Sequence, residues 1–363
     1  MNYHNLCICC MHEKSAGEII CSRCGFDERT YICPSSALPP HTVLNGKYIL
    51  GKVLGAGGFG ITYIAFDTAL EKIMAVKEMF VYQSMYRDNA GSCQMPAAAD
   101  SGMQKSLYEI NRDKFAEEAR ILARLEKVPG IVRVYDLFEE NGTLYTAMEY
   151  LPGMTLKDYC RKHGRMSFRE TLRLMTPMMD SLASLHREGI LHRDISPGNI
   201  MVSPDKTLTL FDFGGAKICG SEEKSQVILA KEGYSPVEQL QTDGSVGPWT
   251  DIYSLSAVIY FCVTGVVPAA SAERVAGKDP VKRPRSLGAY MTGSQEKALM
   301  KGLAVRSRDR YQSMEEMEKA LGAGKRKGLS DKAGSAAVKR HRLLLLLIIA
   351  EEGILAALQM RLV

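Results

Sequence analysis

Alternating hydrophobic residues fill the first part of the central region, and a helical spacing of hydrophobic residues dominates the second part. The alternation predicts strands at 48–54, 60–66, 73–78, 131–138 and 143–149. Between the third and fourth strands, one helical face over 114–125 carries Phe115, Ala119, Leu122 and Leu125. From Thr155 onward helical patterns dominate, notably at 168–188, 251–264 and 295–304. Strands followed by helices predict an α+β fold, with a small β-rich lobe joined to a larger helical lobe.

Composition divides the chain into five segments. A cysteine-rich head (1–34) is followed by a proline-containing linker (35–45), which leads into the long α+β region (46–322). A basic linker of small residues (323–342) and an apolar tail (343–363) close the chain. Within the α+β region, residues 79–111 show no clear period, which favours a long loop insert.

The whole-chain composition, 46% hydrophobic and 24% charged, is that of a soluble globular protein. The net charge of +5 is mild, and basic residues gather near the C-terminus rather than in a stripe, so we expect no nucleic-acid partner. The N-terminus lacks the charged and apolar stretches of a signal peptide, and several of the 10 cysteines are scattered singly. We therefore expect a cytoplasmic protein in a reducing environment.

The apolar tail has a total length that suits one membrane span. The basic residues 339–342 before it would then lie on the cytoplasmic side. Glu351 and Glu352 lie in its middle, however, and a carboxylate at the centre of a bilayer costs about 2.5–3.5 kcal/mol. Membrane association through 343–363 is one interpretation, and an interfacial helix, a partner-binding helix or a degraded anchor are the others.

A glycine-rich turn lies between the first two predicted strands. Glycines let backbone N–H groups approach phosphate oxygens with no side chain in the way. A dinucleotide-binding turn would lead into a helix, but the strand pattern ITYIAF follows here, so that alternative is disfavoured. A plain glycine-rich hairpin stays open as an alternative. The candidate phosphate-binding segment is Leu54-Gly55-Ala56-Gly57-Gly58-Phe59-Gly60.

Lys77 lies inside the third predicted strand, among apolar residues. A lysine in such a place must keep its charge by pairing, and phosphates and a carboxylate would serve. Glu118 on the following helix is the candidate partner, because it shares a face with Phe115 and Leu122 whereas Glu117 points elsewhere. Two solvated charges are the alternative.

The most informative stretch is His192-Arg193-Asp194-Ile195-Ser196-Pro197-Gly198-Asn199, followed eighteen residues after Asp194 by Asp212-Phe213-Gly214. With the glycine turn and Lys77 in order before it, residues 46–322 resemble the bacterial branch of the eukaryotic-type (Hanks-type) serine/threonine protein kinases. The resemblance implies a bilobal protein-kinase-like fold with an N-lobe (46–150) and a C-lobe (151–322). It also implies that Asp194 is the catalytic base, and that Asn199 and Asp212 hold Mg²⁺ or Mn²⁺.

The same resemblance implies a nucleotide site and two anchors in the helical lobe. Met148-Glu149-Tyr150-Leu151 is similar to the hinge that meets adenine, with Met148 as gatekeeper. Arg310 would pair with Glu238, although Val237 stands where the family usually has proline, and Asp251 is the second anchor. Plain core packing is the alternative for Leu54, Ala75 and Met201. Besides the glycine turn, the implied ATP-binding residues are Thr62, Ala75, Lys77, Glu118, Met148, Glu149, Leu151, Met201 and Asp212.

One departure from the family pattern concerns the lysine that usually follows the catalytic aspartate by two residues. Ser196 stands there, and Lys231 stands where the family commonly has the threonine that contacts this lysine. We therefore predict that Lys231 supplies the ammonium near the transferring phosphoryl group and that Ser196 supplies its hydroxyl partner, so both belong to the candidate catalytic set. A solvated loop lysine is the alternative.

Arg193 beside Asp194 is similar to kinases whose activation loop is held by a phosphate. Ser221 and Ser225 lie in the polar segment GSEEKSQ and are the candidate acceptors. Dimerisation for autophosphorylation in trans is a further expectation.

The head contains two CxxC motifs separated by ten residues. Cys7, Cys10, Cys21 and Cys24 together predict a closed, tetrahedral thiolate site for structural Zn²⁺ in a small ribbon-like head. The head has too little apolar mass to fold unaided, so metal binding would supply its folding energy. Cys9 offers an alternative C-x-C pairing.

These features predict an ATP- and Mg²⁺-dependent serine/threonine protein kinase in bacterial signalling, with other proteins as substrates. A nucleotide-binding pseudokinase scaffold is one alternative. A small-molecule phosphotransferase is the other, although such enzymes usually lack the long segment from Asp212 to Glu238.

Overall fold

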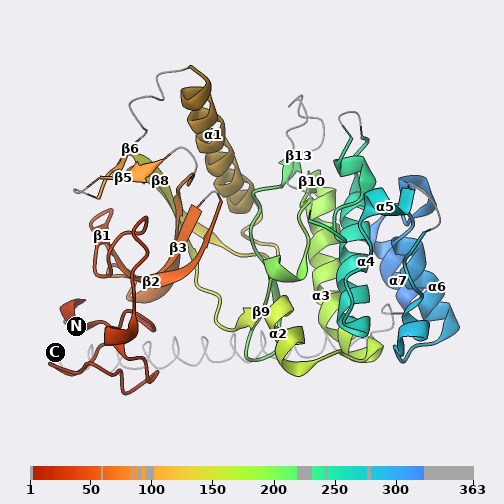
Figure 1. Cartoon of the computed structure of the whole chain (residues 1–363), viewed down its shortest axis with the longest axis horizontal. Coiled ribbons are helices and arrows are strands. Elements are labelled where there is room, and N and C mark those ends of the chain that lie inside the picture. The colour runs from red at the N-terminus through yellow and green to blue at the C-terminus, as the bar shows by residue number, and fades with distance from the viewer. Residues whose placement is uncertain are drawn as a thin grey trace, which may run out of the picture. The chain divides into compact units, whose positions relative to one another are not determined.

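In the described part of the chain, the strands of seven residues or more lie before residue 150 and all α-helices but one lie after it, so the computed structural model has two lobes (Figure 1). The structure describes residues 3–322 except 59, 83–84, 89–90, 95–101, 219–230, 242–243 and 276–278. Phe59, Ser221, Ser225, the basic linker and the apolar tail therefore lie outside the described residues. Within the described part, no helix combines the length and apolar character needed to cross a membrane.

The N-lobe is built on an antiparallel sheet with strand order β1-β2-β3-β4-β8-β7. Tyr63, Val76 and Tyr145 belong to one hydrophobic core on this sheet. Only β7 alternates half-buried with exposed residues, as a strand with one solvent-facing side does, whereas β3, β4 and β8 contain runs of buried residues. The strand bounds are Val43–Leu44, Tyr48–Gly57, Gly60–Asp67, Lys72–Met79, Thr143–Glu149 and Val134–Glu140 in sheet order.

The prediction of a long loop over 79–111 is wrong in two places. β5 (Tyr86–Arg87) and β6 (Cys93–Gln94) form a small hairpin, and helix α1 (Gly102–Arg124) begins inside the predicted loop. The first half of α1 reads GMQKSLYEINRD, in which Met103, Leu107 and Ile110 are spaced four and three residues apart, so a helical signal was present and was missed. The hairpin was missed because its strands are two residues long.

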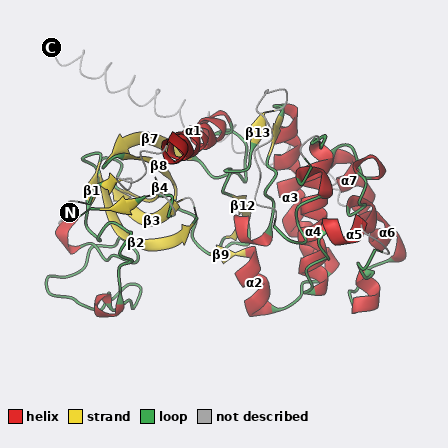
Figure 2. Ribbon diagram, turned by 45° about the horizontal axis from the view of Figure 1, so that its top comes forward, coloured by secondary structure: helices red, strands yellow, loops and turns green. Residues whose placement is uncertain are grey.

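The C-lobe consists mainly of helices (Figure 2). They pack around a second hydrophobic core. α4 lies at its centre and is buried along nearly its whole length, which explains its continuous apolar run. The short strands form the sheets β12-β11-β9 and β10-β13. The helices are α2 (Leu156–His163), α3 (Phe168–Arg187), α4 (Pro248–Thr264), α5 (Ser271–Val275), α6 (Gly293–Gly302) and α7 (Met314–Leu321). The strands are β9 (Met154–Thr155), β10 (Ile190–Leu191), β11 (Ile200–Val202), β12 (Leu208–Leu210) and β13 (Lys217–Ile218).

Local sequence signals fix the ends of these helices. Ser167 begins α3 by accepting a hydrogen bond from Glu170 N, and Thr155 does the same for α2 from Asp158 N. α4 ends at Gly265, whose φ of +72° favours glycine. Short 3₁₀ helices lie at Tyr3–Asn5, Glu28–Thr30, Pro197–Asn199, Val237–Gln239, Pro284–Leu287 and Ser307–Asp309.

The head and the linker pack onto the N-lobe. In the linker, Leu38 is 3% exposed within the N-lobe core and its backbone N–H donates to Tyr63 Oη. In the head, Leu6 and Met11 form a third apolar cluster with residues of the sheet. The head, the linker and both lobes therefore belong to one compact unit, which ends at Leu321.

Candidate active site and cysteine centre

The glycine turn is the hairpin between β2 and β3, and Gly57 pairs with Gly60 at its tip. A Cβ atom added to Gly55, Gly57 or Gly58 would meet no atom within 4 Å, so the space above the turn is open to a ligand. Gly60 differs, because a Cβ there would lie 2.7 Å from the carbonyl oxygen of Glu78. Three of these glycines thus leave room for a ligand, and the fourth allows close packing of β3 on β4.

Lys77 on β4 pairs with Glu118 on α1. Its Nζ atom lies 2.8 and 2.9 Å from the two Glu118 carboxylate oxygens and 3.6 Å from Asp212 Oδ1. Burial alone would lower the pKa of Lys77, but the charges of Glu118 and Asp212 outweigh it and raise the pKa. Glu117 instead pairs with Arg120 on the surface of α1. The structure thus brings together the lysine and the glutamate that the helical face predicted.

Asp194 lies in the loop after β10, with its carboxylate beside two donors. Asn199 Nδ2 donates to Asp194 Oδ2 at 2.7 Å and to its backbone carbonyl at 2.9 Å. Lys231 Nζ donates to the same Oδ2 atom at 2.8 Å and to Ser196 Oγ at 3.3 Å. The Lys231 backbone is fixed in turn by a hydrogen bond from its N–H to Ser235 Oγ. Asp194, Ser196, Asn199 and Lys231 therefore form one polar cluster.

Asp212 follows β12 and has a backbone φ of +63°, an uncommon conformation for a residue with a side chain. Burial would raise its pKa, but Lys77, Lys231 and His192 lower it below the usual value, so the carboxylate is ionised. The next residue, Phe213, donates its backbone N–H to Glu118 Oε1 at 3.3 Å. Asp212 is therefore held between the lysine of the N-lobe and the loop of the C-lobe.

Asp251, in the first turn of α4, holds the loop that carries Asp194. Its carboxylate accepts the backbone N–H groups of His192 and Arg193 at 2.9 and 2.8 Å, and His186 Nε2 lies 2.8 Å away. Arg193 has a φ of +65°, so these hydrogen bonds stabilise a strained loop. Asp251 acts on the site through the backbone.

Glu238 and Arg310 form a buried ion pair in the C-lobe. Arg310 donates to both Glu238 oxygens at 2.6 and 3.1 Å, and Thr250 Oγ1 donates to one of them. The pair ties the segment that contains Lys231 to the helical core. Removing either partner would leave a buried charge unpaired.

The residues implied to surround adenine lie on adjacent elements. Ala75 on β4 is the cross-strand neighbour of Met148 on β8, and Met148 and Leu151 pack against the C-lobe core. Met201 lies on β11 opposite Thr155, and Leu54 is 42% exposed in the second half of β2. The remaining two are Thr62, which faces Lys77 across the ladder, and Glu149, whose N–H donates to Arg133 O.

The four cysteines of the CxxC motifs converge in the head. Their sulfur atoms all lie within 4.8 Å of one another, with Cys7 Sγ 3.7 Å from Cys24 Sγ and Cys10 Sγ 3.8 Å from Cys21 Sγ. Four thiolates in a tetrahedron around Zn²⁺ have sulfur–sulfur separations of about 3.8 Å, given bonds of about 2.3 Å. The donor set and its spacing therefore fit zinc, and Cys9 is not part of the cluster.

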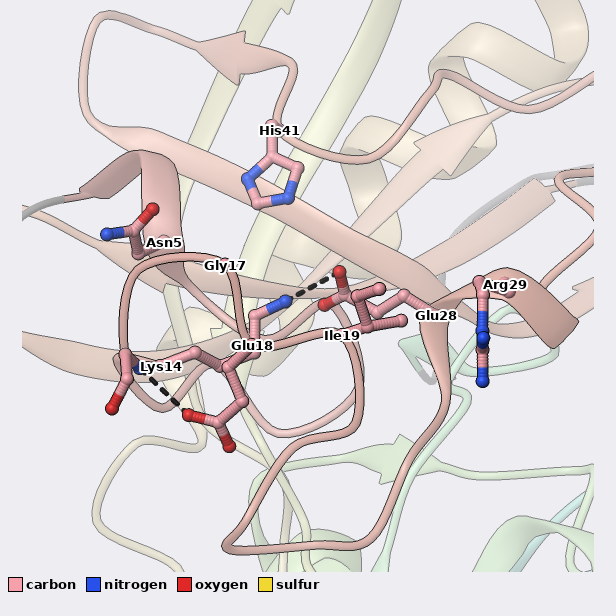
Figure 3. Close-up of a pocket in the computed structure, with 9 residues that line it drawn as sticks. Asn5, Lys14, Gly17, Glu18, Ile19, Glu28, Arg29 and His41 are labelled. Carbon is pink, nitrogen blue, oxygen red and sulfur yellow. Dashed lines mark hydrogen bonds and ion pairs between the residues drawn. The ribbon is translucent and has the colours of Figure 1, made fainter.

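A cavity of about 450 Å³ lies between residues of the head and His41 of the linker (Figure 3). Glu28, which follows the second cysteine loop in the chain, contacts the first one, because its carboxylate accepts from Ile8 N at 3.1 Å and from Lys14 Nζ at 2.6 Å. Lys14 and Glu28 thus neutralise each other within the head. The lining residues are Asn5, Lys14, Ser15, Gly17, Glu18, Ile19, Glu28, Arg29 and His41.

Sequence reasoning missed a buried network around Glu78, which follows Lys77. Arg87 of the insert hairpin donates to both Glu78 oxygens at 2.8 Å, and Tyr63 and Tyr145 donate at 2.6 and 2.9 Å. Burial and the Glu78 charge raise the pKa of Cys93 to about 12, so its thiol is neutral. A charged residue at an inward position of a strand was the available signal, since Glu78 needs a partner.

Comparisons with known proteins agree with this geometry. The protein kinase domain family matches residues 48–296. The chain belongs to the protein kinase family. It is 31% identical over 297 residues to the serine/threonine-protein kinase PknB of Mycolicibacterium smegmatis. The aligned region covers 78% of this chain and 43% of that protein. PknB of Mycobacterium tuberculosis is 30% identical with the same coverage.

A solved structure titled "PpkA-294 apo form" superposes with a TM-score of 0.69 at 32% identity. It covers 79% of this chain and 100% of its own. This kinase domain therefore has the family fold, with a β-rich N-lobe and a helical C-lobe. The chain spans less than half the length of the PknB proteins that it matches.

Proposed function

We propose that this protein transfers the γ-phosphoryl group of ATP to serine or threonine hydroxyls of other proteins. The observation that carries the proposal is the charged cluster between the lobes, where Lys77 lies 2.8 Å from Glu118 and 3.6 Å from Asp212. A lysine held in this way is preorganised, so it can bind phosphate oxygens with little loss of side-chain entropy. The PknB relatives, named as serine/threonine kinases, support the choice of acceptor.

In this proposal, each residue of the site has a defined role. The backbone N–H groups of the glycine turn and the Lys77 ammonium bind the phosphates, and the adenine lies between Ala75, Leu151 and Met201. Asp194 accepts the proton of the acceptor hydroxyl and directs its oxygen in line with the leaving group. Asn199 Nδ2 orients the Asp194 carboxylate.

The oxygen donors of Asn199 and Asp212 fit Mg²⁺. Both are hard ligands, and the ionised Asp212 side chain keeps 44% of its surface exposed, which leaves room for coordination. When bound, Mg²⁺ would neutralise charge on the phosphate oxygens.

We also propose that Lys231 supplies the ammonium that the family pattern usually has two residues after the catalytic aspartate. Its contacts with Asp194 Oδ2 and Ser196 Oγ support this role, because they put the positive charge beside the catalytic carboxylate. A charge there stabilises the charge of the transferring phosphoryl group. Ser196 then acts as the hydroxyl partner of the lysine.

The cysteine centre is proposed to hold structural Zn²⁺, on the strength of its sulfur spacing. Four protein ligands leave no open position, so a catalytic role for this metal is disfavoured. Elemental analysis of the purified, reduced protein is the direct test. About one zinc per chain is expected, and its absence would refute the site.

We further propose that the protein is cytoplasmic and contacts a membrane through 343–363. It would form a dimer for autophosphorylation in trans, with Ser221 and Ser225 as the acceptors. Phosphopeptide mapping of active protein tests the last point. Two unmodified serines would contradict it.

The decisive experiment measures transfer of labelled phosphate from Mg·ATP to a generic protein acceptor, beside an Asp194→Ala control. Transfer by wild type alone supports the kinase. Nucleotide binding without transfer would favour a pseudokinase scaffold, and transfer only to small molecules would favour a small-molecule phosphotransferase. The buried Glu238–Arg310 pair weighs against the latter, because such enzymes usually lack this segment.

A further inference from the structure

The strand that leads into the glycine turn is held from outside by the cysteine head. The pairing of β2 with β3 is irregular between Leu50 and Val53, so the N–H groups there need other acceptors. Lys52 N donates to Ile8 O at 2.7 Å, and Val53 N donates to Tyr31 Oη at 3.0 Å. The head thus supplies both acceptors immediately before Leu54, the first residue of the turn.

Gly51 shows how closely the head approaches this strand. A Cβ atom at Gly51 would clash with the carbonyl oxygen of Ile8 and would lie 2.6 Å from Met11 Sδ. Only glycine therefore permits the observed packing, and this requirement is unrelated to phosphate binding, because Gly51 is buried. The position marks an interface between the head and β2.

The same surface of the head reaches the hinge. Leu6 and Met11 are 0% and 2% exposed and form a cluster with Ile49, Ile64 and Phe66 of the sheet. Tyr150, next to the hinge residue Glu149, packs against this cluster. The head therefore contacts both segments that border the proposed nucleotide site, namely the base of the glycine turn and the hinge.

These contacts depend on the cysteine loops. Ile8 lies between Cys7 and Cys10, and the N–H of Met11 donates to the Cys7 carbonyl at 2.8 Å, which closes the first loop. Zn²⁺ bound to the four sulfurs would fix this loop and the path of the chain to Tyr31. Without metal, a head with so little apolar mass would lose the geometry that places the Ile8 carbonyl.

We propose that the metal-loaded head is a positioning element for the nucleotide, which raises the affinity for ATP by fixing β2 and Tyr150. This inference rests on the proposed ATP and zinc sites. It assigns the head a task in the phosphotransfer reaction itself, in addition to any role in docking.

The first test uses full-length Tyr31→Phe, which removes the acceptor of Val53 N–H and no thiolate. A fluorescent ATP analogue is titrated, and KM for ATP and kcat are measured. One hydrogen bond corresponds to a loss of affinity of about three- to ten-fold, so we expect KM and Kd to rise by that factor while kcat and zinc content stay unchanged. Tyr290→Phe, at a tyrosine that is 93% exposed in the C-lobe, is the matched control.

The second test removes zinc from wild-type protein with a zinc-selective chelator in excess Mg²⁺, and follows binding of the same analogue. Affinity should fall as zinc leaves and return when zinc is added. Unchanged affinity in both tests would overturn the positioning role and leave the kinase assignment intact. A wild-type protein that binds no nucleotide would instead refute the proposed function, and one that holds no metal would refute the metal-dependent role of the head.

Discussion

At the scale of single residues, Asp194 shares one carboxylate oxygen between Asn199 Nδ2 and Lys231 Nζ, at 2.7 and 2.8 Å. Lys231 lies far from Asp194 in sequence, in the segment tied down by Ser235. The positive charge beside the Asp194 carboxylate therefore depends on how that segment is folded. This arrangement links the order of the segment to the chemistry of the site.

Replacing Lys231 by alanine should lower kcat about 100-fold or more, because an ammonium aimed at the transferring phosphoryl group is lost. KM for ATP should change little, since Lys77 is retained. Steady-state kinetics with a protein acceptor provide the measurement. Lys157→Ala, at an exposed lysine of α2, is the control.

A double variant, Ser196→Lys with Lys231→Thr, restores the arrangement that is usual in the family. It should recover at least ten-fold of the activity lost in Lys231→Ala, by the same charge effect, which is worth about 100-fold. A Lys231→Ala protein with the wild-type kcat would contradict the proposed role of Lys231.

Glu118 and Glu117 are adjacent glutamates with different environments, which makes them a matched pair. Glu118→Gln should raise KM for ATP and lower kcat/KM by about ten-fold or more, because the buried Lys77 loses its charged partner. Glu117→Gln should change neither, since its ion pair with Arg120 is on the surface. Equal kinetics for the two variants would contradict the role of Glu118.

The sequence was enough to predict Lys77 and Glu118, because each has a local signal. A lysine inside an apolar strand needs a charged partner, and the helical period shows which glutamate faces inward. Arg87 escaped because it lies in an insert without any period, and only the folded hairpin brings it to Glu78. For a long-range ion pair of this kind, the sequence indicates only one partner, namely the charged residue inside an apolar strand.

At the scale of elements, the β5–β6 hairpin is fastened to the sheet by Arg87. Arg87→Met should lower the free energy of unfolding by about 3–5 kcal/mol, because Glu78 would stay buried without a cation. Urea titration followed by circular dichroism gives the value. Arg112→Met, which removes a surface ion pair with Glu139, should cost only about 0–1 kcal/mol. A small effect of Arg87→Met would mean that the tyrosines alone satisfy Glu78.

The first turn of α4 supports the loop that carries Asp194 through Asp251, and this support depends on pH. Burial would raise the pKa of Asp251, but its hydrogen bond with His186, the His186 and His192 charges and the Arg193 N–H lower it. A lowered pKa means that the ionised group stabilises the fold above its unfolded pKa of about 3.9, and that this stability is lost as pH falls through the folded pKa.

Asp251→Asn should therefore lower the free energy of unfolding by about 2 kcal/mol at pH 6, and the difference from wild type should shrink below about pH 4. Urea titrations at several pH values test this. Asp180→Asn, at an exposed aspartate of α3, should follow wild type throughout. A constant difference at every pH would show that the carboxylate charge is irrelevant.

At the scale of the whole molecule, the order of strands and helices was enough to predict two lobes, because the hydrophobic period changes near residue 150. The packing of the head was beyond reach, since it uses a backbone carbonyl, a tyrosine hydroxyl and two apolar residues in a polar segment. In the sequence, Gly51 is the signal of this close packing. A glycine inside a strand can equally indicate a bulge or a bend, so the signal is ambiguous. The family match begins at residue 48, so the head adds an element to the shared fold.

A variant that lacks residues 1–34 should be less stable than the full chain. Leu6 and Met11 are buried against the sheet, and each such side chain contributes about 1.5–3 kcal/mol, so the free energy of unfolding should fall by about 3–6 kcal/mol. The variant should also bind a dye for apolar surfaces, because Ile49, Ile64 and Phe66 become exposed. A variant lacking 343–363 controls for shortening the chain. If the headless protein unfolds at the same urea concentration as the full chain, the head is a separate module, and its contacts with β2 contribute nothing to the stability of the kinase.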